Sequence, residues 1–396
     1  MVTISEYLLT HRLRDYLDEL AHFSSTRRLK KSLVYRGLKD EIERVAGGIE
    51  HGFYSPPGRP QKKPFYRIVA WNIERGLEFN GILQTLKHHP ELSKGDIFLF
   101  SETDIGMART QNLNVARELA LVLGMNYFFA PSYLNLCKGN SVEDHIEGEN
   151  ALGLHGNAIL SRYPMENLRI VPLKNCKDKM KGKEKRIGCQ KSLVAEVDFP
   201  FKKVTVACVH LDAHSSQRQR GAQIKTVLDS LQGNPHPVLL GGDLNTSSYN
   251  ARHAFFAFCG FWFKVFHGAD RVIEDHYPYP HRFYDRHLFR RLREAGFGYE
   301  DFNEPGVGTL HYTVEDMRGN YLMQEVVPEW CRKVAENKLK KHGGKASFKL
   351  DWLAGRGLKP ASPATGASPP KVIGGLKSAG KPVSDHDAIM VDVNIY

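Results

Sequence analysis

The chain has 396 residues, and its 55 Lys and Arg against 44 Asp and Glu give a formal net charge of +11. Apolar residues make up 41% and charged residues 25%, which supplies a large core and argues against a fibrous, wholly disordered or disulfide-scaffold protein. The positive charge allows an anionic substrate without requiring one. The length suits two or three domains, or one large α/β domain.

The six cysteines form no CxxC pair, and several lie in apolar runs. This pattern predicts reduced thiols. The first twenty residues are charged throughout and resemble no signal peptide. No run approaches the roughly 18 apolar residues that a membrane-spanning helix needs. We therefore expect a cytoplasmic protein without a transmembrane segment.

Residues 1–63 are expected to form a helical N-terminal extension with a linker. Leucines recur there at three- and four-residue spacing, as on one face of a helix. The prolines and glycines of residues 51–64 cannot continue a helix, and indicate a linker. The extension could be a lid or partner surface, or a helical pair packed on the main domain, which would occupy residues 64–396.

Beyond the linker, short apolar strands alternate with helices. Helices are predicted at 110–123, where Gly124 offers a C-cap, and at 216–231, where Ser215 offers an N-cap. Several strands are apolar on both faces and must be covered on both sides. Because strands occur both in succession and in strand–helix–strand units, the pattern favours a layered α/β sandwich. The predicted strands are 65–73, 96–102, 126–132, 157–161, 168–173, 192–199, 203–211, 237–244 and 388–395.

Two later stretches interrupt this pattern. Residues 262–348 are rich in His, Tyr, Arg and Phe, with helix-like pieces near 286–295 and 325–341, and are interpreted as an insertion. Residues 355–383 are rich in Pro, Gly, Ser and Ala, which predicts a flexible, exposed loop.

Polar, chemically competent side chains lie at the ends of apolar runs, most of them after a run and the last pair just before one, where a sheet can present them without disrupting its core. Carboxylate oxygens with water suit Mg²⁺, with Mn²⁺ as a substitute. A carboxylate can take a proton from water, and a histidine can stabilise a departing oxygen. Together these groups predict metal-assisted hydrolysis of a phosphate ester without a covalent intermediate. They are Asn72, Glu102, His210, Asp243, Asn245, Asp351, Asp385 and His386.

Seven short motifs occur at these positions in a recognisable order. They are WNI (71–73), SET (101–103), GNAILSRYP (156–164), VHL (209–211), GDLN (242–245), LDW (350–352) and SDH (384–386). The series resembles the endonuclease/exonuclease/phosphatase superfamily, the fold of DNase I, abasic-site endonucleases, inositol polyphosphate phosphatases and neutral sphingomyelinases. The resemblance covers roughly residues 65–396, and its strength lies in the order of the motifs.

The resemblance implies a four-layer αββα sandwich of two mixed β-sheets with the site at one edge. It implies that Asn72 and Glu102 hold the Mg²⁺, with Asp385 near the metal or the water. Asp243 would orient or deprotonate the attacking water, and Asn245 would contact the phosphate.

By the same likeness His386 would stabilise the transition state, and Asp351 would orient and charge-balance a histidine. His210 matches the strand-end histidine that nuclease- and sphingomyelinase-like members use beside the phosphate. Asn157, in GNAILS, is carried over as a substrate-side amide. Arg218, which opens the predicted helix 216–231, is a further substrate-side candidate, although a solvated helix face would explain it equally well.

The substrate stays open among several classes. The run 174–191 holds eight Lys and Arg against two Asp and Glu, which suits a polyanion or an anionic membrane surface but also a solvated hairpin tip. This run, the net charge and His210 favour a nuclease-like phosphodiesterase. The alternatives are a sphingomyelinase-like phospholipid phosphodiesterase, a phosphatase, and a non-catalytic module that binds phosphate or nucleic acid.

Overall fold

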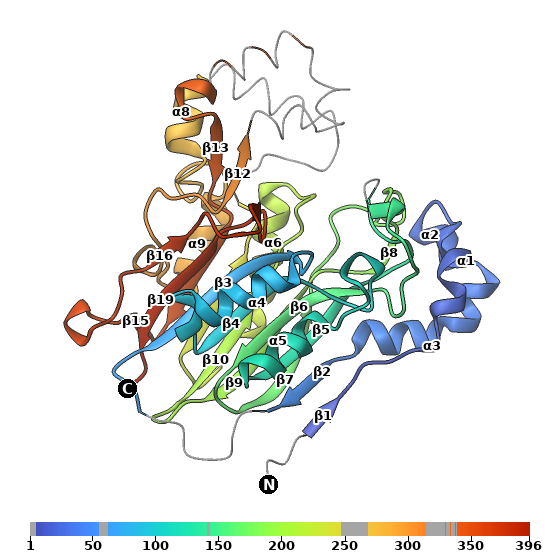
Figure 1. Ribbon diagram of the computed structural model, residues 1–396, viewed down its shortest axis with the longest axis horizontal. Coiled ribbons are helices and arrows are strands. Elements are labelled where there is room, and N and C mark those ends of the chain that lie inside the picture. Colours follow the sequence, from blue (N-terminus) through green and yellow to red (C-terminus); the bar gives the residue numbers. More distant parts are fainter. Residues whose placement is uncertain are drawn as a thin grey trace.

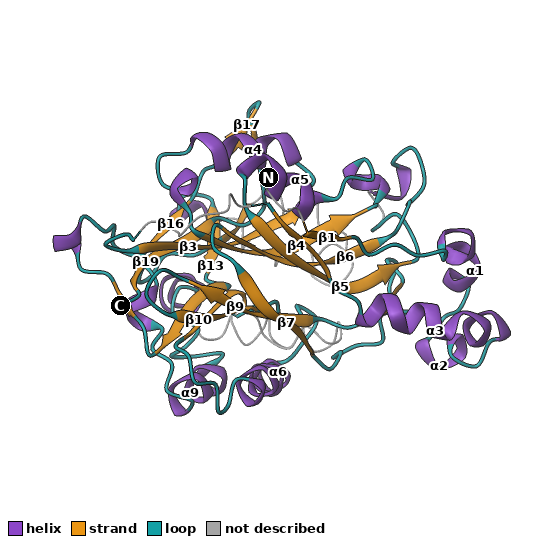
Figure 2. Ribbon diagram, turned by 90° about the horizontal axis from the view of Figure 1, so that it is seen from below, coloured by secondary structure: helices purple, strands orange, loops and turns teal. Residues whose placement is uncertain are grey.

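The computed structural model describes residues 5–54, 62–140, 143–246, 268–313 and 339–396, with single residues at 329, 333 and 337. Two β-sheets lie face to face with helices on their outer sides, so the described chain forms four layers (Figure 2). This architecture confirms the predicted α/β sandwich of two mixed sheets.

The larger sheet has the strand order β1-β2-β5-β6-β4-β3-β19-β15, with β16 also on β19 and β8 also on β5 (Figure 1). β3 and β4 are parallel, and most other pairs are antiparallel. Its strands are β1 (Ser5–Tyr7), β2 (Glu50–Phe53), β3 (Tyr66–Arg75), β4 (Ile97–Ile105), β5 (Asn126–Asn135), β6 (Leu154–Ser161), β8 (Arg186–Gly188), β15 (Lys359–Pro360), β16 (Lys371–Ile373) and β19 (Ala388–Asn394).

The smaller sheet has the order β14-β11-β10-β9-β7, with β10 and β11 parallel. All nine strands predicted from the sequence are present, with ends shifted by a few residues. The strands of this sheet are β7 (Met165–Pro172), β9 (Lys191–Asp198), β10 (Lys203–Cys208), β11 (Val238–Asp243) and β14 (Asp351–Arg356).

Three layers of buried side chains hold the sandwich together. Successive residues of β10 show why its strand is apolar on both faces: Val206 packs between the two sheets, and Ala207 packs against the outer helices. A third cluster fills the space between the larger sheet and its own helices. The covering helices are α4 (Phe79–His88) and α5 (Val115–Leu123) on the larger sheet, and α6 (Gln217–Ser230) and α9 (Arg286–Glu294) on the smaller one (Figure 2).

The helix ends follow the capping rules with one correction. Gly124 ends α5 in the left-handed conformation at φ 61°, as predicted. The N-cap of α6 is Ser216 and not Ser215 as predicted, because Ser216 and Gln219 form a reciprocal capping box.

The N-terminal segment is more than a helical extension. It contains three helices, as the leucine spacing predicted, but β1 and β2 also add two strands to the edge of the larger sheet. The sequence missed β2 because its buried positions are Glu50 and Gly52, which are not apolar. The helices are α1 (Leu17–Ala21), α2 (Thr26–Leu29) and α3 (Leu33–Gly47).

The two interrupting stretches also differ from expectation. The helix predicted near 286–295 is α9, whereas most of the one predicted at 325–341 lies outside the described residues. Within the predicted flexible loop 355–383, β15 and β16 pair with β19 and so belong to the sheet. The remaining short elements are α8 (Ala269–Arg271), β12 (Leu310–Thr313), β13 (Lys345–Phe348), β17 (Lys377–Ser378), β18 (Lys381–Pro382), the π-helical turn η5 (Val272–His276), and the 3₁₀ turns η1 (Arg14–Tyr16), η2 (Leu92–Lys94), η3 (Ala108–Thr110), η4 (Glu143–His145), η6 (Glu300–Phe302) and η7 (Pro363–Thr365).

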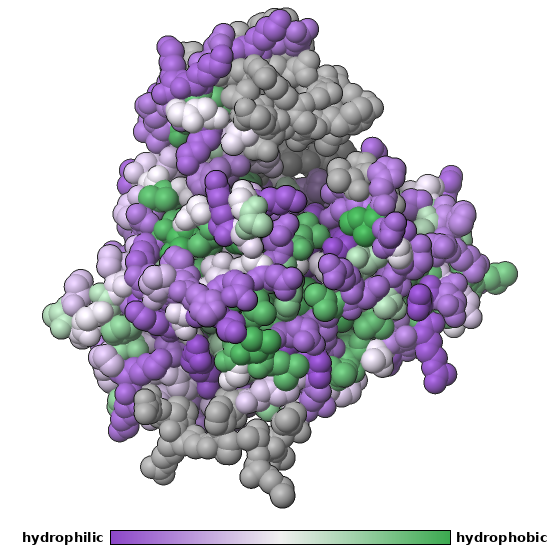
Figure 3. All heavy atoms as spheres, viewed as in Figure 1, coloured by the Kyte–Doolittle hydropathy of each residue, from purple (hydrophilic) through white to green (hydrophobic). Residues whose placement is uncertain are grey.

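Surface and thiols complete the description. On the face drawn in Figure 3, apolar patches are interrupted by hydrophilic side chains. Among the described helices none is long and apolar enough to cross a membrane. No disulfide joins any two of the described cysteines, Cys137, Cys176, Cys189 and Cys208, and the other two cysteines lie outside the described residues.

Candidate active site

Polar side chains from both sheets meet at one edge of the sandwich. Asn72 and Glu102 come from the parallel neighbours β3 and β4, and Asp243 ends β11 of the facing sheet. Asn72 Nδ2 donates to Asp243 Oδ2 at 3.2 Å, which ties the two sheets together at this point. Asp351 lies opposite Asp243 in the register of β14 and β11. The sequence-predicted strand ends therefore converge.

Asp243 is the central carboxylate of the site. Its Oδ1 accepts from the Asn245 amide at 2.8 Å, and its Oδ2 accepts from Asn245 Nδ2 at 3.2 Å. Burial and then the nearby Asp351 charge raise the pKa of Asp243 to about 8. The preceding Gly242 has φ 129°, and a Cβ there would lie 2.2 Å from the Val209 carbonyl oxygen. Only glycine lets the chain present Asp243 in this way.

Asn245 holds the turn after β11. It adopts φ 49°, in the left-handed region that Asn tolerates better than most residues. Its Nδ2 also donates to the Leu211 carbonyl at 2.9 Å, so the amide braces the loop beside His210. Contact of Asn245 with a phosphate, as predicted, stays a prediction.

Asp351 and His386 form a buried pair. His386 Nδ1 donates to Asp351 Oδ2 at 2.8 Å, and Thr309 Oγ1 donates to the same oxygen at 2.6 Å. Burial opposes the charged imidazole, but Asp351 and Asp385 raise the pKa of His386 well above its usual value. Thr309 could not be found from the sequence, because it lies in the segment interpreted as an insertion and matches no motif.

Glu102 sits on strained backbone at φ 56°. Its Oε2 is 3.9 Å from Arg75 Nε, and its Oε1 is 4.0 Å from His210 Nε2. Burial disfavours the ionised carboxylate, but the positive charge of Arg75 outweighs it and lowers the pKa of Glu102. The carboxylate is therefore ionised at neutral pH.

His210 bridges the two carboxylates. Its Nε2 is 3.6 Å from Asp243 Oδ2, on the same side as Glu102. Its Nδ1 is 3.5 Å from Gln190 Nε2. Burial lowers the pKa of His210 to about 4, so the ring is neutral at pH 7.

Two residues, Asn157 and Arg218, were predicted to lie on the substrate side. Asn157 is wholly buried: its Oδ1 accepts from the Glu102 amide at 3.3 Å, and its Nδ2 donates to the Lys191 carbonyl at 3.0 Å. Asn157 therefore holds the Glu102 backbone in place. Arg218 is exposed on α6. The neighbouring Arg220 is buried in an ion pair with Asp285. Contact of Asn157 or Arg218 with a substrate stays a prediction.

Two charged residues at the site escaped the sequence analysis. Glu74 and Arg75 follow the WNI motif in an irregular part of β3, at φ 45° and 66°. The Asp385 amide donates to Glu74 Oε2 at 3.1 Å, while the Asp385 side chain is exposed. Burial and Asp385 raise the pKa of Glu74 to about 7. The one feature of the sequence that could have indicated Glu74 and Arg75 is their position directly after the WNI motif.

A sequence profile of the "Endonuclease/Exonuclease/phosphatase family" matches residues 69–386. The chain belongs to this family. The predicted resemblance is thus confirmed, and the matched range begins just before Asn72 and ends at His386.

Individual relatives of the family are distant. The chain is 35% identical over 115 residues to the uncharacterized protein YbhP of Escherichia coli K12, which is 28% of this chain and 42% of that relative. The chain therefore matches less than half the length of YbhP. Among solved structures, an endonuclease/exonuclease/phosphatase from Beutenbergia cavernae has a TM-score of 0.46 at 16% identity, covering 84% of this chain and 72% of its own. The human Nocturnin catalytic domain with bound sulfate has a TM-score of 0.44 at 16% identity, and the match covers 84% of this chain and 93% of the Nocturnin domain.

The site of this family member has the donors that a divalent cation requires. Atoms of Asp243, Asp351 and His386 that could bind a metal lie within 4.8 Å of one another. Because His386 Nδ1 is hydrogen-bonded to Asp351, the available donors in this group are the two carboxylates. Asp351 Oδ1 is buried and has no hydrogen-bond partner in the described part of the chain. Glu102 adds a further carboxylate with an accessible side chain. Hard oxygen donors of this kind fit Mg²⁺ or Mn²⁺.

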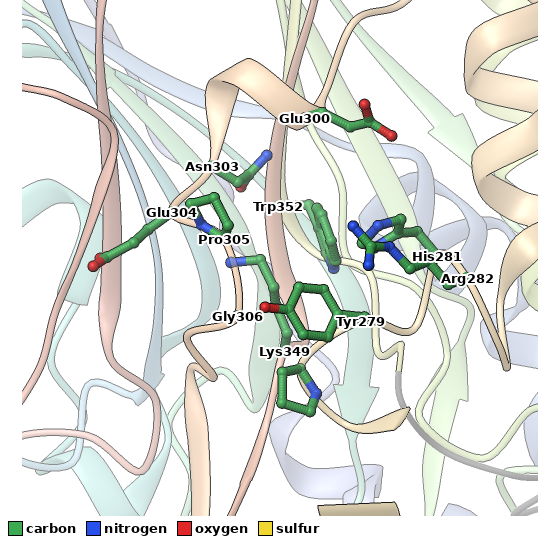
Figure 4. A pocket seen from close by; sticks show the side chains of 11 residues that line it. Tyr279, His281, Arg282, Glu300, Asn303, Glu304, Pro305, Gly306, Lys349 and Trp352 are labelled. Carbon is green, nitrogen blue, oxygen red and sulfur yellow. The ribbon is translucent and has the colours of Figure 1, made fainter. Parts of the chain in front are cut away.

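A pocket of about 140 Å³ lies on the other face of β14 (Figure 4). Trp352 lines this pocket. Because successive side chains of a strand point to opposite faces of the sheet, its neighbour Asp351 lies on the other face, and the pocket is separate from it. The Lys349 ammonium lies 4.9 Å from the centre of the Trp352 ring. None of the site carboxylates described above lines this pocket.

Proposed function

We propose that the chain is a divalent-metal-dependent phosphodiesterase that hydrolyses its substrate by direct attack of water. The observation that carries the proposal is the arrangement around Asp243. This buried carboxylate has a raised pKa and lies beside the Asp351–His386 pair at the edge of both sheets. A raised pKa makes the ionised carboxylate a stronger base than a free one, and in that form it is suited to accept a proton from water.

Each residue has a role in this proposal. Glu102, Asn72 and Asp385 would hold Mg²⁺ or Mn²⁺, which when bound polarises a phosphate oxygen as a Lewis acid. Asp243 orients the attacking water and takes its proton. His386, protonated through its pairing with Asp351, donates to a phosphate oxygen in the transition state.

Two neutral groups complete the proposed site. His210 has a lowered pKa of about 4, so its ring is neutral at pH 7 and can donate one hydrogen bond to the phosphate without repelling the metal. Asn245 contributes an amide beside Asp243. No nucleophilic side chain is required, because the attacking group is water.

For the substrate we favour a nuclease-like phosphodiester over a phospholipid or a phosphate monoester. The net charge of +11 and the basic run 174–191 support a substrate with many phosphates. We keep the cytoplasm as the proposed location, because no disulfide joins any two of the described cysteines.

A substrate panel with and without Mg²⁺ tests the proposal. It contains single- and double-stranded DNA, RNA, sphingomyelin, inositol phosphates and a chromogenic phosphodiester. We expect Mg²⁺-dependent cleavage that Glu102→Gln and Asp243→Asn abolish. The exposed-acid variants Glu19→Gln and Asp229→Asn are matched controls that should retain full activity. Undiminished cleavage in both site variants would reject the assignment, and binding of phosphate without any cleavage would favour the non-catalytic module.

Salt dependence separates the substrate classes. If the substrate is a polyanion, log kcat/KM should fall steeply as log salt rises, because each phosphate contact releases counterions. A flat dependence together with cleavage of sphingomyelin would favour the phospholipid alternative.

A further inference from the structure

The N-terminal segment, residues 5–54, lies outside the matched family range 69–386 but packs against the basic loop, residues 174–191. Helices α1 and α2 lie beside β8, which is part of this loop (Figure 1). Thr26 donates to Asp178 through both its amide, at 3.1 Å, and its hydroxyl, at 2.5 Å. Lys185 Nζ donates to the Ala21 carbonyl at 2.5 Å.

The N-terminal segment is itself firmly anchored. Its β2 pairs with β5 of the larger sheet, and the buried Glu50 carboxylate accepts from the Tyr127 hydroxyl at 2.9 Å. Apolar side chains of α1 to α3 share one buried cluster with Met180 of the basic loop. Burial of this kind, at about 25 cal/mol per Å² of apolar area, holds the segment in place. The segment therefore gives the loop a fixed support.

The opposite side of the basic loop contacts the catalytic edge. Gln190 Nε2 is 3.5 Å from His210 Nδ1. Lys179 Nζ donates to both oxygens of Asp212, at 2.8 and 2.9 Å, two residues beyond His210. The loop thus connects the N-terminal segment to the histidine that lies between Glu102 and Asp243.

The cations of the basic loop fall into two groups. Lys179, Lys185, Arg186 and Lys191 are held internally. Lys179 pairs with Asp212, Lys185 and Lys191 donate to backbone carbonyls, and the Arg186 guanidinium lies 4.2 Å from the centre of the Tyr133 ring. A second group of side chains is exposed to solvent and can meet an anion. It consists of Lys174, Lys177, Lys181 and Lys183.

We propose that the N-terminal segment is a positioning element that holds the basic loop as one wall of the active site, so that its exposed lysines bind substrate phosphates beyond the scissile one. Thr26 is a positioning residue in this arrangement, because it acts on the substrate only through Asp178 and the loop. The inference rests on the proposed phosphodiesterase function and adds that specificity for a long polyanion depends on residues outside the family range.

The test compares three full-length variants with the wild type. Thr26→Val keeps the shape of the side chain but removes the hydroxyl that donates to Asp178. Thr26→Ser restores that hydroxyl, and Thr226→Val is a matched control at an exposed position on α6. The first readout is hydrogen exchange of the backbone amides of residues 174–191. The second is the pair of KM and kcat values for a 12-nucleotide single strand and for a small chromogenic phosphodiester, both with Mg²⁺.

For Thr26→Val we expect amide exchange in the loop to quicken about tenfold, the effect of losing one charge-assisted hydrogen bond. We expect KM for the 12-nucleotide strand to rise about five- to tenfold for the same reason, with kcat for both substrates and KM for the small diester unchanged. Thr26→Ser should restore both readouts, and Thr226→Val should change neither.

Unchanged exchange in Thr26→Val would show that the segment does not hold the loop. Equal losses on both substrates, or a loss confined to kcat, would also overturn the proposal, because they indicate general destabilisation. If the wild type cleaves no substrate, the proposed function fails, and the exchange experiment together with equilibrium binding of the 12-nucleotide strand still decides the positioning role.

Discussion

The substitution Asn157→Ala examines whether this amide supports Glu102 or faces the substrate. Asn157 is wholly buried and makes hydrogen bonds to the Glu102 amide and the Lys191 carbonyl. Alanine leaves both backbone groups buried and unpaired, at about 1–3 kcal/mol each. After partial relaxation, we expect the free energy of unfolding to fall by about 2–4 kcal/mol.

Activity should fall for a related reason. The strained conformation of Glu102, at φ 56°, costs about 1–3 kcal/mol and persists only while its surroundings enforce it. Without Asn157 this backbone can relax, and the Glu102 carboxylate then leaves its place beside Arg75 and His210. We expect kcat to decrease and Mg²⁺ to bind more weakly, while KM for the substrate changes little.

Urea unfolding followed by circular dichroism measures the stability of Asn157→Ala, and titration calorimetry measures its Mg²⁺ affinity. Asn394→Ala, at an exposed position near the end of β19, is the matched control and should lose less than about 0.5 kcal/mol. An unchanged free energy of unfolding combined with a raised KM would refute this reasoning, and would restore the substrate-side role predicted from the sequence.

Three further predictions follow from buried charges. Asp351→Asn should lower kcat about 1,000-fold. It should also move the alkaline fall of the pH–rate profile to lower pH, because Asp351 raises the pKa of His386. An alkaline limb at the wild-type pH would contradict this. Asp285→Ala leaves Arg220 buried without its carboxylate and should cost about 3–5 kcal/mol in urea unfolding with unchanged Mg²⁺ affinity; a loss below about 1 kcal/mol would count against it. Burial lowers the pKa of Lys191 from 10.5 to about 8, so the unfolded chain binds more protons than the folded chain between these two pH values. The free energy of unfolding should therefore rise with pH across this window by up to about 3 kcal/mol relative to Lys191→Met. Equal slopes of unfolding free energy against pH in the two proteins would exclude this.

The strands and the catalytic edge were predictable because their physical causes are written locally in the sequence. β10 is buried on both faces, and its run of apolar residues showed this directly. Asp243 follows two glycines at the end of an apolar run, where a buried strand must stop and a polar side chain can be presented. The family resemblance implied that Asp351 orients a histidine, and the structure places Asp351 Oδ2 2.8 Å from Nδ1 of His386.

The features that escaped prediction depend on long-range contacts. Asn157 lies in a recognised motif, but its burial beneath Glu102 arises from the packing of β4, β6 and β9. Thr309 reaches Asp351 across 42 residues of sequence. β2 was missed because Glu50 lacks apolar character, and its carboxylate is satisfied by partners that only the fold supplies.

The most direct test of the central claim is the rate of hydrolysis of a chromogenic phosphodiester, measured against Mg²⁺ concentration for the wild type and for Asp243→Asn. We predict a saturable Mg²⁺ dependence in the wild type and a loss of at least about 1,000-fold in kcat for the variant, which should remain folded. Hydrolysis that is independent of divalent metal, or that survives in Asp243→Asn, would contradict this claim.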